Sequence, residues 1–158
     1  MNRNEILSIL QEVTDPEIPV LTIADLGIVR DVIIHNNEAE IVITPTYSGC
    51  PAMDAIAFDI RLKLLEHGYK NVKITQVLSP AWTTDWMTES GKEKLRQYGI
   101  APPHRLKQLL SSGEPPSVIC PRCSSANTQL LSQFGSTACK ALYQCNDCKE
   151  PFDYFKCH

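Results

Sequence analysis

Apolar residues near the start of the chain recur every three or four positions and then cluster in two short runs. The helical repeat over residues 4–13 predicts a short helix with a single apolar stripe. Residues 28–35 and 38–44 are rich in Val and Ile, and Asn36-Asn37 between them tolerates the positive φ of a tight turn. We therefore expect a helix followed by a β-hairpin.

A second helix and a third strand are expected after the hairpin. Apolar residues beyond Cys50 keep the spacing i, i+3, i+4, i+7, i+11, which predicts a helix that packs on the sheet and stops near Gly68. Residues 71–78 alternate apolar and polar side chains, as a strand does. The order αββαβ predicts a small two-layer α+β domain.

Beyond this domain the chain becomes more polar and is interrupted by prolines. Residues 88–98 predict a polar surface helix that ends at Gly99. Residues 101–116 are rich in Pro, Ser and Gly and too polar to hold a core. We expect a first domain over residues 1–100, a linker over residues 101–116 and a separate module over residues 117–158.

Composition narrows the classes of function. The chain has 158 residues, 43% of them hydrophobic, and a formal net charge of −3. It can bury one moderate core, and it has no basic surface of the kind that binds nucleic acids. No apolar run approaches a membrane span, and the first residues do not resemble a secretory signal. We expect a cytoplasmic protein that binds neither nucleic acid nor membrane.

Cysteine spacing predicts a metal site in the last module. Six of the seven cysteines lie in the last 39 residues, and they include two C-x-x-C pairs. These pairs are Cys120 with Cys123 and Cys145 with Cys148. Four thiolates can hold zinc tetrahedrally at about 2.3 Å and leave no position for water. A module of this size rarely folds on its core alone, so metal binding would supply much of its stability.

The metal itself is left open by the spacing. The same four sulfurs suit a single iron or an iron–sulfur cluster, and one C-x-x-C pair suits a redox dithiol. Cys139 and Cys157 fall outside the paired spacing and remain unassigned, as does His158. The fold class expected for the whole chain is α+β, a two-layer domain followed by a β module of the zinc-ribbon type with four cysteine ligands.

The seventh cysteine, Cys50, lies where the hairpin ends and the second helix begins. The segment is Thr44-Pro-Thr-Tyr-Ser-Gly-Cys50-Pro-Ala-Met53. Free amide groups and the positive end of the helix dipole favour a thiolate at such a position, and Pro51 suits the first helical position. Thiolates bind soft metals and attack electrophiles. Cys50 is therefore the candidate reactive residue.

Acidic and aromatic residues are candidates for the surroundings of Cys50. The carboxylates of Asp15, Glu17 and Asp25 suit turn and helix-capping roles, and the alternative is that they surround the cysteine. Trp82 and Trp86 suit packing at the edge of the core, and the alternative is a lid over the cysteine loop.

The sequence contains little that demands an enzyme. The histidines at positions 35, 67, 104 and 158 include no obvious general base for Cys50, although His67 or His104 could fold back towards it. Phosphate-binding and dinucleotide-binding glycine motifs and the H-E-x-x-H zinc motif are absent.

Several motifs resemble a known family. Three motifs, Asp15-Pro-Glu-Ile-Pro-Val, Asp25-Leu-Gly-Ile-Val and Thr44-Pro-Thr-Tyr-Ser-Gly-Cys-Pro-Ala, together resemble the SufT-related family of iron–sulfur assembly factors. The stretch from Phe134 to Tyr143, the cysteine pairs and Pro151-Phe-Asp-Tyr-Phe resemble the PaaD (also PaaJ) proteins of bacterial phenylacetate degradation.

This resemblance implies a role in assembling iron–sulfur clusters for the multicomponent phenylacetyl-CoA epoxidase, with its reductase component as the client. The family's cysteine motif falls on Cys50, and its acidic motif falls on Asp15-Pro16-Glu17. The zinc ribbon is an extension that simpler members lack, and it suits client docking.

Our leading hypothesis from the sequence is an assembly or delivery factor without catalytic activity of its own. Cys50 would transiently bind iron or a cluster, while Asp15, Glu17, Thr44 and Thr46 would shape its surroundings. One cysteine cannot enclose a cluster, so the hypothesis demands a bridging homodimer, a ligand from the client or a small thiol. The alternatives are a structural subunit of the epoxidase and an enzyme with Cys50 as nucleophile.

Overall fold

The chain folds into two compact units. The computed structural model describes residues 1–104 and 117–156. One unit comprises Met1–Trp82 and Trp86–Thr88, and the other comprises Thr83–Asp85 and the chain from Glu89 onward.

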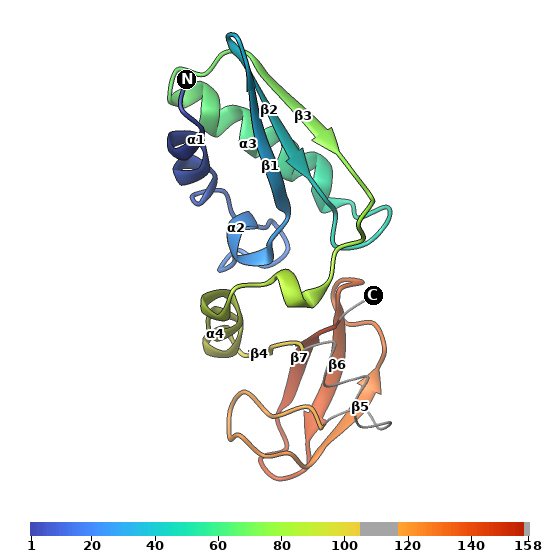
Figure 1. The fold of residues 1–158 in the computed structure, drawn as a ribbon. Helices are drawn as coiled ribbons and strands as arrows, with labels where there is room; N and C mark the ends of the chain where they lie inside the picture. Colours follow the sequence, from blue (N-terminus) through green and yellow to red (C-terminus); the bar gives the residue numbers. More distant parts are fainter. Residues whose placement is uncertain (105–116, 157–158) are drawn as a thin grey trace. The chain divides into compact units, whose positions relative to one another are not determined.

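The first unit contains the expected αββαβ order with one added short helix (Figure 1). Its elements are α1 (Arg3–Leu10), α2 (Ile23–Leu26), β1 (Val29–His35), β2 (Glu38–Ile43), α3 (Ala52–Glu66) and β3 (Val72–Gln76). The added helix α2 lies at the Asp25-Leu-Gly27 turn signal. The Thr22 hydroxyl and the Asp25 carboxylate form a reciprocal capping box at its start, and Gly27 ends it with φ 71°.

The three strands form one mixed sheet in the order β1-β2-β3. β1 and β2 pair antiparallel across a turn in which Asn36 has φ 51°, which confirms the predicted hairpin. β2 and β3 pair in parallel and are connected through α3. As a result the chain leaves β2 and enters α3 at one end of the sheet, which is where Cys50 lies.

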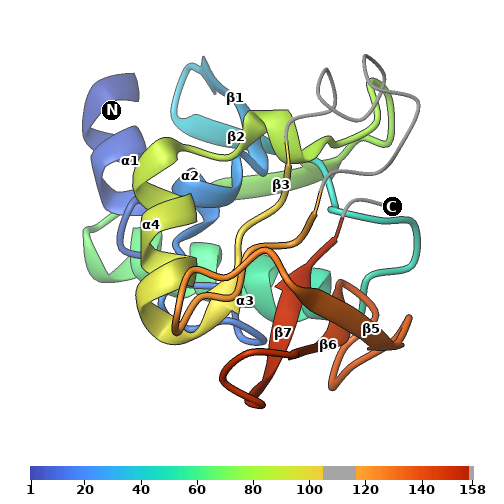
Figure 2. The ribbon, with the colours of Figure 1, turned by 90° about the horizontal axis from the view of Figure 1, so that it is seen from below.

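The core lies between this sheet and two helices (Figures 1 and 2). Both α1 and α3 contact the sheet, and they contact each other. Each element contributes fully or almost fully buried aliphatic side chains: Ile6, Ile9 and Leu10 from α1, Ala39, Ile41 and Ile43 from β2, and Ile56, Ile60 and Leu64 from α3. This is the two-layer arrangement that the sequence predicted.

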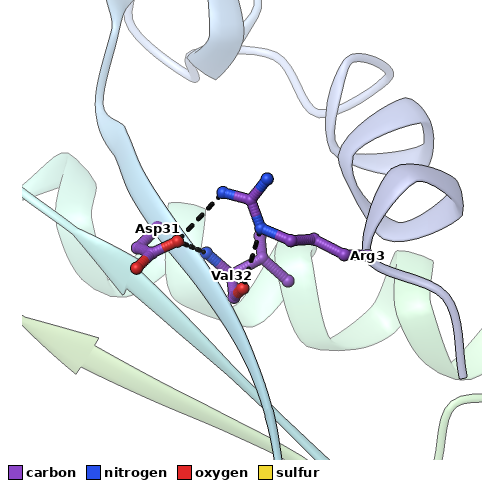
Figure 3. Close-up of polar contacts among 3 residues, drawn as sticks. All are labelled: Arg3, Asp31 and Val32. Carbon is purple, nitrogen blue, oxygen red and sulfur yellow. Dashed lines mark hydrogen bonds and ion pairs between the residues drawn. The ribbon is translucent and has the colours of Figure 1, made fainter.

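A polar contact connects the start of α1 to β1 (Figure 3). The Arg3 guanidinium donates from Nε to the Val32 carbonyl at 3.1 Å and forms an ion pair with Asp31 at 3.0 Å. Asp31 also accepts a hydrogen bond from the Val32 amide at 2.8 Å. Asp31 follows a bulge in β1, so this contact lies where the strand register shifts.

The second unit is built on a four-stranded sheet in the order β4-β7-β6-β5. Besides Thr84 and Asp85 of the short helix η1 (Thr84–Trp86), its elements are α4 (Glu89–Tyr98), β4 (Ile100–Ala101), β5 (Thr128–Ser132), β6 (Lys140–Cys145) and β7 (Pro151–Phe155). Figure 2 shows β5, β6 and β7 side by side. Phe152 and Phe155 are buried, and Phe152 belongs to the core of the ribbon. The predicted β module at the end of the chain is therefore present.

The division into units differs from the boundary expected from composition. The predicted polar helix is α4, and it groups with the ribbon and not with the first domain. Ala101, expected in the linker, is a buried residue of β4, which pairs in parallel with β7. Most of the expected linker, residues 105–116, lies outside the described residues. Because these residues are not described, the predicted domain limits, 1–100, 101–116 and 117–158, stay a prediction.

None of the helices within the described residues combines the length and the apolar character that a membrane crossing requires.

Candidate functional site

Cys50 is positioned by the end of β2 and a tight turn. Thr44 follows β2, is 1% exposed, and donates its amide to the Ile28 carbonyl at 2.9 Å. The chain then turns so that the Cys50 amide donates to the Tyr47 carbonyl at 3.3 Å. Gly49 adopts φ 78° with no atom near an added Cβ, so glycine is favoured there by backbone conformation and not by space.

At the start of α3, one backbone amide bonds the Cys50 sulfur. Pro51 is the N-cap residue and makes no side-chain capping bond. It therefore lies one position earlier than the expected first helical position. The Ala52 amide donates a hydrogen bond that favours the Cys50 thiolate, so the sulfur takes the place of a capping side chain.

Burial nevertheless dominates the protonation of Cys50. It raises the pKa of the half-buried thiol above its ordinary value, and the Glu17 carboxylate raises it further. Hydrogen bonds involving Ala52, Tyr47 and Thr46 lower the pKa, but they do not outweigh burial. The expected preference for thiolate is therefore wrong for the unliganded site.

The loop that contains Asp15 and Glu17 carries two carboxylates with different roles: one supports the loop, and the other acts on Cys50. Asp15 is 8% exposed, and its Oδ1 accepts hydrogen bonds from the Glu17 amide at 2.7 Å and the Ile18 amide at 2.9 Å. Its observed bonds are thus those of turn chemistry. Glu17 is the carboxylate that acts electrostatically on Cys50. Asp15 thus shapes the loop that carries Glu17.

Asp25 and the tryptophans support the fold around α2. Asp25 accepts hydrogen bonds from the Thr22 amide and the Thr88 hydroxyl, each at 3.1 Å. Trp82 is 6% exposed and donates from Nε1 to the Leu26 carbonyl at 2.7 Å, while Arg30 lies 3.7 Å from the centre of the Trp86 ring. These contacts match the capping role expected for Asp25 and the core-edge packing expected for the tryptophans. The Trp82 indole contacts α2, and the Trp86 indole contacts Arg30 of β1.

Buried polar atoms add one further feature to the loop. Thr44 Oγ1 is buried and has no hydrogen-bond partner within the part of the chain that the structure describes. Such a group is costly unless another molecule satisfies it. Thr44 and Thr46 were both candidates from the sequence: Thr46 contacts the Cys50 thiol, whereas Thr44 supplies an unsatisfied hydroxyl on the segment that leads to it.

Tyr47 is the residue near Cys50 to which the sequence assigned no role. Its side chain hydrogen-bonds with the Cys50 thiol. Its place three residues before the cysteine was a usable signal, because a turn of that length brings the two residues together and a phenol is a donor.

The histidine of α3 cannot serve Cys50 as a base. His67 is the C-cap of the 15-residue helix that Cys50 precedes. The two ends of such a helix lie about 22 Å apart. His35 pairs with Glu38 beside the hairpin turn, at the opposite end of β2 from Thr44. His104 belongs to the second unit.

The second candidate site consists of the four ribbon cysteines. Cys123 and Cys145 bring their Sγ atoms within 3.5 Å of each other, and Cys120 and Cys148 theirs within 3.8 Å. All four sulfurs lie within 4.8 Å of one another. A tetrahedron with metal–sulfur bonds of about 2.3 Å has edges of about 3.8 Å, so this donor set fits one metal ion.

The two C-x-x-C turns have the same backbone form. The residue after each second cysteine is left-handed, with φ 63° at Ser124 and 66° at Lys149. The Cys148 amide points to the Cys145 sulfur at 3.5 Å, and it is the main reason that the pKa of Cys145 falls to about 7. Amide groups directed at a sulfur favour the thiolate that a metal requires.

The remaining cysteines lie outside this set. Cys139 is buried, and its Sγ is 3.0 Å from the Thr137 hydroxyl. Cys157 and His158 lie outside the described residues.

Both halves of the chain match known protein families. Residues 3–75 match the family described as iron–sulfur cluster assembly protein, and residues 106–156 match the PaaD zinc beta ribbon domain. A protein of Escherichia coli K12, whose name designates a subunit of 1,2-phenylacetyl-CoA epoxidase, is 53% identical over 156 residues, which span 98% of this chain and 92% of that protein. The chain belongs to the PaaD family. Its motifs, its fold and its cysteine cluster agree with that membership.

Further relatives match about three fifths of the chain. An Fe–S protein maturation auxiliary factor of Porphyromonas gingivalis W83 is 37% identical over 93 residues, covering 58% of this chain and 88% of that protein. A solved DUF59 domain from Bacillus anthracis matches with a TM-score of 0.55 at 31% identity, over 59% of this chain and 90% of that one. The protein TM0487 of Thermotoga maritima matches with a TM-score of 0.52 at 27% identity, over 60% and 94%. The two-layer fold is therefore shared beyond the PaaD family.

Proposed function

We propose that this PaaD-family protein is an accessory factor that receives iron or an iron–sulfur cluster through Cys50 and delivers it to the phenylacetyl-CoA epoxidase. The client we propose is the reductase component. The observation that carries the proposal is the surroundings of Cys50, a half-buried thiol that hydrogen-bonds with Ala52, Tyr47 and Thr46 and is acted on by the Glu17 carboxylate. The match of residues 3–75 to the iron–sulfur assembly family supports the same role.

The electrostatics of this site suit a transient cation. Without a metal, burial and Glu17 keep the Cys50 thiol protonated. An arriving iron ion reverses this preference, because a cation beside the sulfur stabilises the thiolate and is itself attracted by Glu17. The hydrogen bonds from Ala52, Tyr47 and Thr46 then stabilise the charged sulfur. The thiol is thus unreactive when empty and ligates when metal arrives.

We propose zinc as the resident metal of the ribbon. The sulfur spacing suits one ion better than a cluster in which each thiolate binds a separate iron. Zinc bound by four thiolates has no open position and would stabilise the fold without taking part in transfer.

Client recognition is the role we propose for the ribbon surface. Strand β5 is an edge of the sheet as far as the structure describes the chain, because it pairs there with β6 alone. Leu130, Leu131 and Phe134 on or beside this strand are about half exposed or more. An exposed strand edge with apolar side chains suits pairing with an extended segment of another protein.

The proposal is tested by reconstitution and transfer. Purified protein is incubated anaerobically with ferrous iron and sulfide, re-isolated, and mixed with the cluster-free reductase, whose cluster content is measured by absorbance and Mössbauer spectroscopy. We expect Cys50→Ala to lose iron uptake and transfer while the ribbon keeps its zinc. Cys139→Ala is the matched control, because it removes a cysteine from outside both sites. Full cluster occupancy of the reductase with Cys50→Ala would refute the proposal.

A second candidate function is a structural subunit of the epoxidase. It is favoured by the name of the Escherichia coli relative, which designates a subunit. This alternative predicts stable stoichiometric co-purification and epoxidase activity that needs the protein continuously. The delivery role predicts that a reductase with its cluster already in place works without it.

A thiol enzyme is the least supported alternative. The pKa of Cys50 is raised, and neither His35 nor His67 lies where it could act as its base. Rapid labelling of Cys50 by an electrophile at neutral pH would favour this alternative.

A further inference from the structure

The outer face of α3 carries an exposed seam that no part of the first unit covers. Its residues follow the spacing 3, 4, 3, 4 that places side chains along one line of a helix: Pro51, Asp54, Phe58, Arg61 and Leu65. All five are exposed, with Phe58 at 63% and Leu65 at 53%, and Leu62 beside them is 44% exposed. Three large apolar side chains on one helix face are more than scattered surface apolar residues account for.

The charges on this seam have no partner within the described residues. Lys63, at the edge of the same helix, forms ion pairs with Glu12 and Glu66. The side chains of Asp54 and Arg61, in contrast, make no ion pair or hydrogen bond anywhere in residues 1–104 and 117–156. They are seven residues apart, about 10 Å along the helix, and so cannot pair with each other.

The positions of these charges are self-complementary. Asp54 lies one turn before Phe58, and Arg61 lies one turn after it. A two-fold axis through Phe58 that sets two copies of α3 antiparallel places each Asp54 opposite the Arg61 of the second copy. Phe58 then meets its own counterpart at the centre. An isologous interface requires this arrangement, in which a surface matches itself.

We infer that the α3 seam of this protein binds the α3 seam of a second copy, in an antiparallel homodimer centred on Phe58. The two seams then bury their apolar residues together and satisfy both pairs of charges. One pair of helices buries less than the roughly 1,600 Å² of a standard interface, so the dimer is weak and depends on concentration.

This dimer also fixes the distance between the two Cys50 residues, whether or not they bind iron or a cluster. Cys50 lies eight residues before Phe58, so the antiparallel arrangement places the two cysteines about 24 Å apart along the helices. One cluster cannot bridge that distance. In this dimer the further ligands of a cluster come from the client or from a small thiol.

Sedimentation velocity over a wide range of concentrations tests the inference on the full-length protein. We expect a monomer–dimer equilibrium in the wild type and its loss in Phe58→Glu. Asp54→Arg and Arg61→Asp should each weaken the dimer about tenfold, because each sets like charges opposite each other at two symmetric positions. The double variant Asp54→Arg/Arg61→Asp should recover most of the affinity, because the pairs are formed again with their signs exchanged.

Matched controls separate the seam from overall charge. Glu38→Arg and Lys70→Asp change exposed residues away from the seam by the same amounts of charge and should leave the equilibrium unchanged. Thermal unfolding of each variant checks that the monomer is intact. A wild type that stays monomeric throughout, or a double variant as weak as the single ones, overturns the inference. If the wild type is monomeric and Phe58→Glu abolishes binding of the client, the seam binds the client and not a second copy. That result also overturns the inference.

Discussion

The Glu17 carboxylate restrains Cys50 in the unliganded protein. Glu17 raises the pKa of the thiol, so its removal lowers that pKa and increases the thiolate fraction at any pH below it. We therefore predict that Glu17→Gln accelerates alkylation of Cys50 by iodoacetamide at neutral pH and shifts the pH–rate profile to lower pH. Glu38→Gln is the control, since Glu38 lies at the far end of β2. An unchanged or slower rate in Glu17→Gln would show that the carboxylate does not face the thiol.

The unsatisfied hydroxyl of Thr44 predicts opposite effects on stability and on function. Thr44→Val keeps the shape of the side chain and removes a buried hydroxyl that has no partner among the described residues. We expect the free energy of unfolding to stay the same or to rise by up to about 1 kcal/mol. Iron uptake should fall if this hydroxyl serves the cargo.

The control for Thr44 is a buried threonine with a partner. Thr84 is also 1% exposed, but its hydroxyl donates to the His104 carbonyl. Thr84→Val should cost about 1 kcal/mol and leave iron uptake unchanged. Urea titrations and the reconstitution assay measure the two quantities. A clear loss of stability in Thr44→Val would assign its hydroxyl a structural role.

At the level of residues, the sequence pointed to two side chains that act on the Cys50 thiol, but not to the direction in which its pKa shifts. Thr46 lies near Cys50 because both belong to the segment between β2 and α3, whereas Glu17 comes from a loop before α2 and reaches Cys50 through the tertiary fold. The direction of the pKa shift was not predictable, because it depends on how deeply the sulfur is buried. Burial is a property of the tertiary fold that no local spacing encodes.

At the level of elements, periodic segments were predictable and a very short strand was not. The helix α3 and the β1–β2 hairpin follow from spacing and from the Asn36-Asn37 turn, which are local signals. Strand β4 has two residues, and its partner β7 lies about fifty residues later in the sequence. It forms because Ala101 joins the ribbon core, and a contact so distant leaves no periodic pattern.

The turn at the end of α2 offers a test of close packing between elements. A Cβ at Gly27 would lie 2.4 Å from the Trp86 carbonyl oxygen, and its φ is 71°. Gly27→Ala therefore combines backbone strain with a clash, and we predict a loss of about 2–4 kcal/mol. Gly68→Ala is the control, because Gly68 has φ 89° but no atom within 4 Å of an added Cβ, so only strain of about 1 kcal/mol applies.

These two glycine variants are compared by urea unfolding, followed by tryptophan fluorescence. Both tryptophans of the chain lie near Gly27: the Trp82 indole donates to the Leu26 carbonyl, and the backbone of Trp86 supplies the clashing oxygen. Equal losses in the two variants would mean that the segment at Trp86 yields, and that its contact with α2 is not tight.

At the level of the whole molecule, the two units are stabilised by different means. The first unit has a continuous core of Ile and Leu side chains from its helices and its sheet. The ribbon core is small, and two of its five buried members, Cys120 and Cys145, are also proposed metal ligands. Removal of the metal should therefore affect the second unit selectively.

The ribbon should depend on its metal for folding, whereas the first unit should not. Structural zinc contributes on the order of 10 kcal/mol to the folding of small zinc domains, which exceeds what a ribbon core of this size supplies. We predict that Cys145→Ser, or treatment with a strong chelator, abolishes the dispersed amide NMR signals of residues 117–156. The signals of residues 1–76 should remain, because the core of that unit includes no metal ligand. Cys139→Ser is the control, since its sulfur lies outside the four-cysteine set, and it should retain one zinc per chain by mass spectrometry. Ribbon signals that persist after complete removal of the metal would mean that strands β4 to β7 fold on their apolar contacts alone, and that the four thiols are not what stabilises this unit.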